Sequence, residues 1–342
     1  MKKIFLILLS ISLIFFSACS KQNETVKKIE TKNEINTTKI VTTVAPIASI
    51  IQYIWGEYVS VDSLIEPGFS PHTFDLKPSQ LIAMEKADYI IATGLSIDNF
   101  IEKNTQEEKH ILLKDYVNLM EWEEHNHDHH NEGHHDEYHD EHHDAHWHDE
   151  HHDDHWHIDQ HKDETLKENT EIFYDPHLWL SLENGVKIAE KITEILSKKD
   201  PENKVVFEQN LTDFKTKAEK IKNNFVKNTE NKKLNNFVIF HEAYGYLFHE
   251  MNIDVSKVVV LQETAGRETS VNEMKHIVDE IKEHNVKVLY KEPQLDTKLI
   301  NTLVEKHSLE LSELDPLGKT IEKNWYFDTI EQNLNNLLLS YE

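Results

Sequence analysis

Residues Asp200 to Lys227 have the sequence DPENKVVFEQNLTDFKTKAEKIKNNFVK, and this stretch decides how the rest of the chain is organised. Asp200 and Pro201 supply a helix N-cap and a proline at the first helical position, and no further glycine or proline follows. A helix of this length spans roughly 40 Å. We therefore expect one long rigid α-helix over residues 201–228 that joins two folded lobes.

On the N-terminal side of this helix, short β-branched runs alternate with helical segments. We expect strands at 39–44, 58–65, 87–93 and 110–113, and helices at 47–55, 78–86 and 183–198. Strands that alternate with helices are typical of an α/β fold with a mainly parallel sheet. The pattern therefore predicts an N-terminal α/β lobe over residues 39–200.

The same alternation returns on the C-terminal side. We expect strands at 237–240, 255–261, 286–290 and 309–314, and helices at 242–251, 271–284, 297–307 and 324–341. A length of 342 residues also fits two domains. The predicted fold is thus α/β, with a second lobe over residues 229–342, and each lobe has a mainly parallel sheet flanked by helices.

A histidine-rich tract interrupts the N-terminal lobe, and the segment from His125 to His161 holds 16 of the chain's 24 histidines. These are His125, His127, His129, His130, His134, His135, His139, His142, His143, His146, His148, His151, His152, His155, His157 and His161. Neutral imidazole is the commonest protein ligand for metal ions, and the carboxylates between the histidines attract cations. We interpret residues 122–169 as a disordered insertion that offers weak auxiliary metal sites. A solvated loop without a specific role is the alternative, but Lys, Glu and Ser would serve solvation alone.

The N-terminus has the pattern of an export signal. Lys2 and Lys3 precede an apolar run that ends at Phe16 and is too short for a membrane-spanning helix of about 20 residues. The ending Phe16-Ser17-Ala18-Cys19 resembles a bacterial lipobox, which predicts a signal peptide over 1–18, a lipid on Cys19 and a flexible tether to residue 38. An ordinary signal peptide with a chance cysteine is the alternative. Cys19 is the only cysteine, so disulfides and thiolate metal sites are excluded.

The net charge of the chain restricts its partners. A formal charge of −26 argues against nucleic acid, because phosphate binding needs clustered lysine and arginine side chains. The same charge favours association with cations. We expect a protein without a nucleic-acid partner.

Three histidines outside the tract share one setting. His72, His177 and His241 each lie in a loop or at a strand-to-helix junction, where open α/β sheets bind their ligands. His72 and His177 each follow a proline, which restricts the local backbone. Any one of the three alone could be a surface histidine, so the prediction of a site depends on the set.

The motifs around these histidines resemble those of a known family. Pro67-Gly68-x-x-Pro71-His72, Asp175-Pro176-His177-x-Trp179-Leu180 and Phe240-His241-x-Ala243-Tyr244-Gly245-Tyr246 are similar to the metal-binding signatures of zinc and manganese substrate-binding lipoproteins of ABC importers. The zinc branch, of the ZnuA and AdcA type, is the more similar. The resemblance runs from Lys39 to the end, and includes Glu292-Pro293-Gln294, Leu314-Asp315-Pro316-Leu317-Gly318 and the acidic histidine insertion.

The resemblance implies a metal ion in the cleft between the lobes. His72 and His177 would come from the N-terminal lobe and His241 from the C-terminal lobe. Three imidazoles with a carboxylate or water suit tetrahedral zinc. Asp315 occupies a position that supplies a carboxylate in several relatives, so the fourth ligand is Asp315 or water. The manganese branch has Glu at the third position, and His241 there favours zinc.

The resemblance also implies an extracytoplasmic, high-affinity zinc-binding protein. We expect it to be a monomer, periplasmic or anchored to the membrane through Cys19, that captures Zn²⁺ as cargo and delivers it to an ABC permease. The alternatives are a manganese-binding transporter component and a metal-buffering or adhesin lipoprotein. A zinc hydrolase is not expected, because His241-Glu242-Ala243-Tyr244-Gly245 starts like the HExxH motif but has glycine in place of the second histidine.

Overall fold

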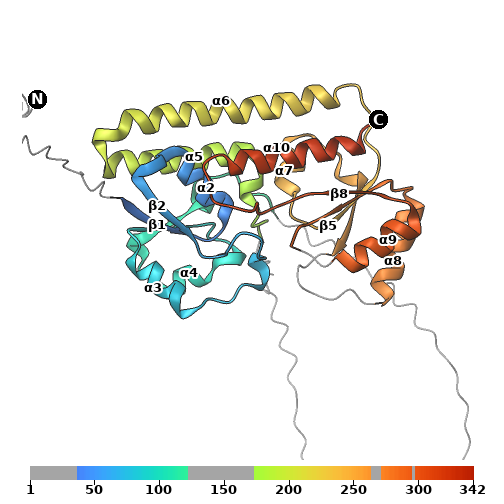
Figure 1. Cartoon of the computed structure of the whole chain (residues 1–342), viewed down its shortest axis with the longest axis horizontal. Coiled ribbons are helices and arrows are strands. Elements are labelled where there is room, and N and C mark those ends of the chain that lie inside the picture. Colours follow the sequence, from blue (N-terminus) through green and yellow to red (C-terminus); the bar gives the residue numbers. More distant parts are fainter. Residues whose placement is uncertain (1–36, 122–172, 263–270, 295–296) are drawn as a thin grey trace, which may run out of the picture. The chain divides into compact units, whose positions relative to one another are not determined.

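Two four-stranded sheets with the same strand order form the framework of the chain (Figure 1). The computed structural model describes residues 37–121, 173–262, 271–294 and 297–342, which belong to one compact unit, Thr37–Glu342. The predicted signal peptide, Cys19, almost all of the tether and the histidine-rich insertion lie outside the described residues.

The N-terminal sheet contains β1 (Thr38–Thr42), β2 (Val59–Ser63), β3 (Tyr89–Ala92) and β4 (His110–Leu112). The strands are all parallel, in the order β2-β1-β3-β4. The helices between them are α2 (Ala45–Trp55), α3 (Pro78–Lys86) and the short α4 (Phe100–Asn104). The sequence pattern predicted every one of these elements except α4, which at one turn is too short to show a helical period.

The C-terminal sheet repeats this topology. Its strands are β5 (Phe237–His241), β6 (Val258–Gln262), β7 (Val288–Lys291) and β8 (Glu310–Glu313), parallel and in the order β6-β5-β7-β8. The helices are α7 (Gly245–Glu250), α8 (Val271–Glu283), α9 (Thr297–His307) and α10 (Trp325–Leu337). The helix expected over 242–251 begins only at Gly245, because a tight turn from His241 to Ala243 separates it from β5.

Short 3₁₀ turns complete the described structure. They are Gly56–Tyr58, Pro71–Thr73 (η2), Ser96–Asp98 (η3), Glu107–Lys109, Leu113–Asp115, Leu178–Leu180 (η6), Pro201–Asn203 (η7), Val255–Lys257 and Leu338–Ser340.

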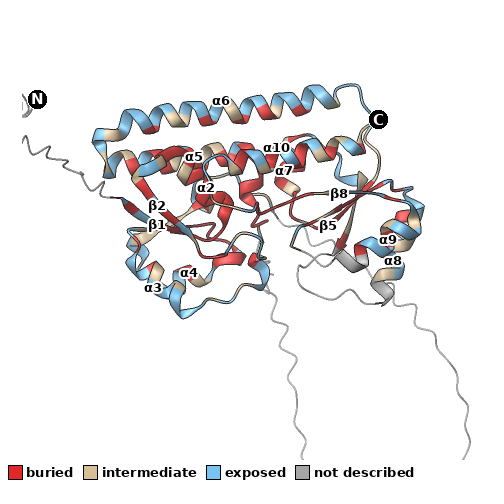
Figure 2. Cartoon of the chain, in the orientation of Figure 1, coloured by how far each residue is buried: buried red, intermediate tan, exposed pale blue. Residues whose placement is uncertain are grey.

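A pair of long helices connects the two sheets. Helix α5 (Leu182–Lys199) leads through the η7 turn into α6 (Lys204–Thr229), which packs along it. Asp200 caps the η7 turn, since its carboxylate accepts a hydrogen bond from the Asn203 N–H at 3.3 Å, and the α-helix itself begins at Lys204 instead of at the predicted residue 201. Helix α6 is exposed along most of its surface (Figure 2) and buries one stripe, formed by Phe207, Phe214, Ala218, Ile221 and Phe225. The predicted long helix between the lobes is confirmed.

The hydrophobic core is shared between the lobes. Each sheet has an outer core of its own, which includes Val41 and Ile90 in the first lobe and Val238 and Leu289 in the second. The inner core is continuous and joins residues of α2, α5 and α6 with residues of β5, α7 and α10. Helix α10 follows β8 in the chain, yet it packs against α2 and α6. Buried apolar contacts therefore hold the two lobes together, in addition to the covalent link through α6.

Within the part of the chain that the structure describes, no helix has both the length and the apolar character needed to cross a membrane.

Candidate metal centre

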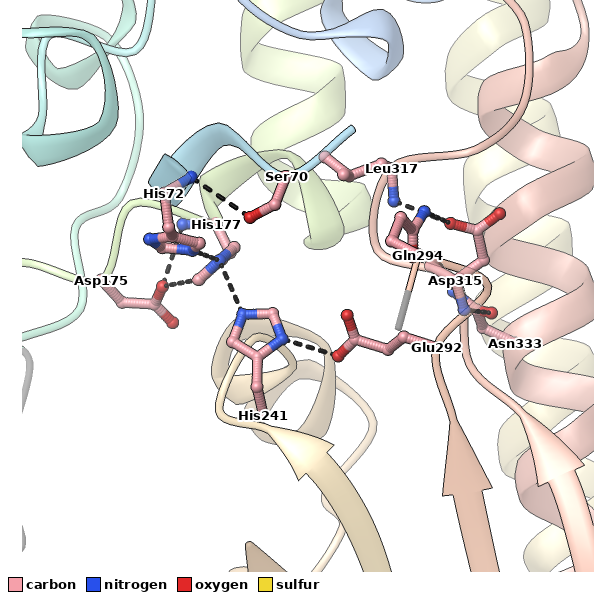
Figure 3. A network of polar contacts seen from close by, with 10 residues as sticks. All are labelled: Ser70, His72, Asp175, His177, His241, Glu292, Gln294, Asp315, Leu317 and Asn333. Carbon is pink, nitrogen blue, oxygen red and sulfur yellow. Dashed lines mark hydrogen bonds and ion pairs between the residues drawn. The ribbon is translucent and has the colours of Figure 1, made fainter. Parts of the chain in front are cut away.

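The three histidines singled out in the sequence meet in one place (Figure 3). Nε2 of His177 lies 3.1 Å from Nε2 of His72 and 3.4 Å from Nε2 of His241. Zn–N bonds of about 2.0–2.1 Å in a tetrahedron place neighbouring nitrogens roughly 3.3–3.4 Å apart. The spacing of the three nitrogens therefore fits one zinc ion.

His72 comes from the loop that follows β2. Pro71 opens the η2 turn, and the Ser70 hydroxyl accepts a hydrogen bond from the His72 N–H at 3.3 Å. The η2 turn packs against η3, so the loop is held on the N-terminal lobe. His72 is exposed, whereas His177 and His241 are 1% and 4% exposed. The centre is thus open to solvent on the His72 side.

His177 is oriented by Asp175. Oδ1 of Asp175 accepts a hydrogen bond from the His177 backbone N–H at 2.9 Å and lies 2.8 Å from Nδ1 of the imidazole. An ionised carboxylate only accepts hydrogen bonds, so this contact assigns the proton to Nδ1 and leaves the Nε2 lone pair for a metal ion. Asp175 therefore fixes the orientation of the His177 ring.

His241 is oriented by Glu292 in the same way. His241 ends β5, Glu292 directly follows the neighbouring strand β7, and Oε1 of Glu292 lies 2.6 Å from Nδ1 of His241. The chain continues from β5 to its neighbour β6 and from β7 to its neighbour β8, which lie on opposite flanks of the β5–β7 pair, and open α/β sheets bind ligands at such a point. The motif Glu292-Pro293-Gln294 did not by itself predict this role. The position of Glu292 two residues beyond the strand predicted at 286–290 was the available signal.

The electrostatics of the cluster keep His72 neutral. Loss of solvent around the ring nitrogen that faces the other two histidines, and then the neighbouring imidazoles of His177 and His241, lower the pKa of His72 from 6.5 to about 3. A neutral imidazole is the form that binds a metal ion. At neutral pH His72 therefore presents an unprotonated ligand nitrogen.

Asp315, the predicted carboxylate ligand, has a different set of partners. Its Oδ1 accepts hydrogen bonds from Gln294 Nε2 at 3.0 Å, from the Leu317 N–H at 3.1 Å and from the Gly318 N–H at 2.9 Å. Among the described residues, the group of ligand atoms lying within 4.8 Å of one another contains the three histidines and does not include Asp315. The structure thus brings together three of the four predicted cleft residues. Cys19 and the tract histidines lie outside the described residues.

The pocket at the centre is small. It encloses about 310 Å³ including its open mouth, and residues of both lobes line it, among them Ser70, Pro316 and Leu317. Part of this space is open solvent, so the enclosed part is much smaller than a pocket for an organic ligand, which starts at about 300 Å³. The pocket and its three nitrogens suit a single ion better than an organic solute.

Two parallel-sheet lobes joined by a long helix, with three imidazoles meeting between them, define a solute-binding protein for a metal ion. The family model described as zinc-uptake complex component A, periplasmic, matches residues 40–338. The chain belongs to this family.

Individual proteins agree with this assignment. The high-affinity zinc uptake system protein ZnuA of Haemophilus influenzae is 30% identical over 316 residues, which cover 87% of this chain and 91% of that protein. The zinc-binding lipoprotein AdcA of Streptococcus pneumoniae is 24% identical over 350 residues. The match covers 98% of this chain but only 60% of AdcA. A crystal structure of ZnuA superposes with a TM-score of 0.65 at 22% identity, covering 88% of this chain and 99% of that one.

Proposed function

We propose that this protein binds zinc with high affinity outside the cytoplasm and delivers it to an ABC permease for import. The observation that carries the proposal is the convergence of three Nε2 atoms, with 3.1 Å and 3.4 Å between neighbours, at the meeting point of two lobes. Membership of the zinc-uptake component family supports the same function.

The proposed ligands are His72, His177 and His241, with Asp315 or water in the fourth position. The substitution Asp315→Asn distinguishes the two, because it preserves the shape of the side chain and removes the charge. If Asp315 is a ligand, the substitution weakens zinc binding about as much as the loss of a histidine. If water fills the position, zinc affinity changes only slightly.

The three nitrogen donors favour zinc over manganese. Imidazole suits zinc, copper and nickel, whereas carboxylate, carbonyl and water oxygens suit manganese. The supply of metal ions outside the cytoplasm then decides among the nitrogen-preferring metals, so the test must include several ions. Chelator competition with Zn²⁺, Mn²⁺, Ni²⁺ and Cu²⁺ should give tight zinc binding at one ion per cleft and weak manganese binding. Tighter binding of manganese than of zinc would contradict the proposal.

The family is one of binding components, and we propose that this member carries out no catalysis. The donor set meets in a small pocket, and the segment from His241 to Gly245 lacks the second histidine of a metalloprotease motif. Zinc-loaded protein should accordingly leave peptide and ester substrates intact. Hydrolysis that is lost in the variant His241→Ala would contradict this part of the proposal.

We further propose that the mature protein is a monomer, anchored to the membrane by a lipid on Cys19 and held off it by residues 20–38. The lipobox-like ending at Cys19 supports the anchor. Replacing Cys19 by Ser should release the protein from the membrane fraction, and light scattering on the released protein should give one chain per particle. Retention of the Cys19→Ser protein in the membrane would contradict the anchor.

A further inference from the structure

Helix α7 follows the third histidine of the metal centre, His241, in the chain and packs against the chain next to the second histidine, His177. It starts four residues after His241 and packs against η6 and α5, the elements that follow His177. Tyr246 and Glu250 are four positions apart on α7 and therefore share one face of it. That face contacts the chain on both sides of His177.

Tyr246 holds the segment just before His177. Its hydroxyl donates a hydrogen bond to the Asp175 carbonyl at 3.0 Å and accepts one from the Met120 N–H at 3.0 Å. The Asp175 N–H in turn donates to the Met120 carbonyl at 3.0 Å, which closes a ring of hydrogen bonds. Burial raises the pKa of Tyr246 to about 12, so the hydroxyl keeps its proton. Tyr246 is 5% exposed, and loss of its hydroxyl would leave the buried Asp175 carbonyl and the part-buried Met120 N–H without this partner.

Gly245 brings the start of α7 against the carboxylate that orients His177. A Cβ at this position would lie 3.1 Å from Oδ2 of Asp175 and 3.3 Å from the Met120 sulfur. The other oxygen of the same carboxylate contacts Nδ1 of His177. Any larger residue at position 245 would therefore press on the group that orients the second histidine.

Glu250 holds the segment just after His177. Its Oε2 accepts hydrogen bonds from the Ser181 hydroxyl at 2.8 Å and from the Glu183 N–H at 3.3 Å. Ser181 is the N-cap of α5, and Lys222 of α6 lies 3.5 Å from Oε1 of Glu250. The Glu250 side chain is 6% exposed. A buried, hydrogen-bonded carboxylate of the C-terminal lobe thus holds the start of a helix of the N-terminal lobe.

We propose that Tyr246 and Glu250 are positioning residues for the metal centre, which fix the backbone on both sides of His177 relative to His241. The 3.4 Å separation of the two Nε2 atoms is then set before the metal ion arrives, so binding needs little rearrangement of the lobes. This inference rests on the proposed zinc-binding function. It assigns to Gly245 and Tyr246 of the third motif a role that the histidine alone does not explain.

The full-length protein and single variants of it test the proposal. Zinc dissociation constants come from chelator competition, the melting temperature of the metal-free protein from calorimetry, and site geometry from the visible absorption of bound Co²⁺. Removal of groups that orient metal ligands weakens metal binding by about 10–100-fold. We expect Tyr246→Phe to raise the zinc dissociation constant at least tenfold and to alter the Co²⁺ spectrum.

Tyr290→Phe is the matched control. The Tyr290 hydroxyl is also buried and hydrogen-bonded, to the Asn336 carbonyl at 3.1 Å and to Ser340 at 2.8 Å, and these partners belong to α10 and the turn after it instead of the His177 segment. This variant should lower the melting temperature, leaving the zinc dissociation constant and the Co²⁺ spectrum unchanged. For Glu250, the variant Glu250→Gln retains an acceptor oxygen and should bind zinc more tightly than Glu250→Ala.

The outcomes separate this inference from the proposed function. If wild-type protein shows no tight zinc step, both are overturned. If wild-type protein binds zinc tightly and Tyr246→Phe and Glu250→Ala bind it equally well, with unchanged Co²⁺ spectra, the proposed function stands and the positioning role is wrong. Lower melting temperatures alone in these variants would show that α7 only stabilises the fold.

Discussion

Oε1 of Glu292 lies 2.6 Å from Nδ1 of His241, across the gap between the ends of β7 and β5. Oδ1 of Asp175 contacts Nδ1 of His177 at 2.8 Å in the same manner. Two of the three histidines thus present Nε2 to the cleft because a carboxylate holds the other ring nitrogen. Such partners orient the ring and raise its basicity as a ligand.

The first prediction concerns Glu292. Replacing it by Ala should raise the zinc dissociation constant about 10–100-fold, because His241 loses the group that fixes its tautomer and orientation. Glu292→Gln retains a hydrogen-bond acceptor and should have a smaller effect. Glu313→Gln, a change to a partly exposed carboxylate beside Lys291, is the control. Equal zinc affinity of Glu292→Ala and this control, measured by chelator competition, would rule out the role.

The second prediction concerns His177, the central member of the cluster. His177→Ala should abolish tight zinc binding, because only two of the three nitrogen ligands remain. The far-ultraviolet circular dichroism should be unchanged. The exposed His249 provides the control, and His249→Ala should bind zinc as the wild type does. A surviving tight step in His177→Ala would remove this residue from the ligand set.

The third prediction concerns acidity and the metal-free protein. The pKa of His72 is 6.5 in the unfolded chain and about 3 in the folded one. Between these values the unfolded chain binds more protons, so the free energy of unfolding falls as the pH drops from about 6.5 towards 3. Urea unfolding in the presence of a chelator at pH 7 and pH 5 measures the effect. His72→Gln should lose less stability over this interval than the wild type, and an equal loss would contradict the prediction.

The fourth prediction concerns the insertion. Deleting residues 122–169 leaves four residues, 170–173, between Glu121 and Tyr174, which form an antiparallel bridge in the structure. Four-residue connections are common between antiparallel strands, so the fold should tolerate the deletion. Calorimetry should show that weak zinc binding is lost and one tight site is retained, with the melting temperature still raised by zinc. Loss of the tight site would mean that the tract supplies cleft ligands.

The fifth prediction concerns Asp98, which is buried in the N-terminal lobe. Its carboxylate accepts hydrogen bonds from the Thr43 hydroxyl at 2.8 Å and from the N–H groups of Thr93 and Gly94 at 2.7 and 2.9 Å. Asp98→Ala should lower the free energy of unfolding by about 3 kcal/mol or more, because several buried donors lose their acceptor. Urea unfolding measures the change. Asp98→Asn, which keeps one acceptor oxygen, should lose less, and equal stability of all three proteins would contradict the prediction.

Much of the fold was predictable from local patterns. Asp200 and Pro201 marked the start of the long helix, and β-branched runs such as that at Phe237 marked the buried strands. These signals depend on neighbours in the chain, because helix capping and side-chain periodicity act over a few residues. The same holds for the motifs at His72, His177 and His241, which carried the family resemblance.

The sequence by itself therefore determined the α/β class, the long connecting helix and the three histidines of the site. Only the tertiary structure decided that β5 and β7 are neighbours, which places Glu292 beside His241 although 51 positions separate them in the chain. It also decided that Asp315 accepts hydrogen bonds from Gln294 and from a turn. The same packing lets Tyr246 of one lobe donate a hydrogen bond to the segment before His177 in the other. The physical reason is that strand order and lobe packing arise from the burial of apolar surface between distant segments. The spacing of residues along the chain does not indicate which strand ends this burial brings together.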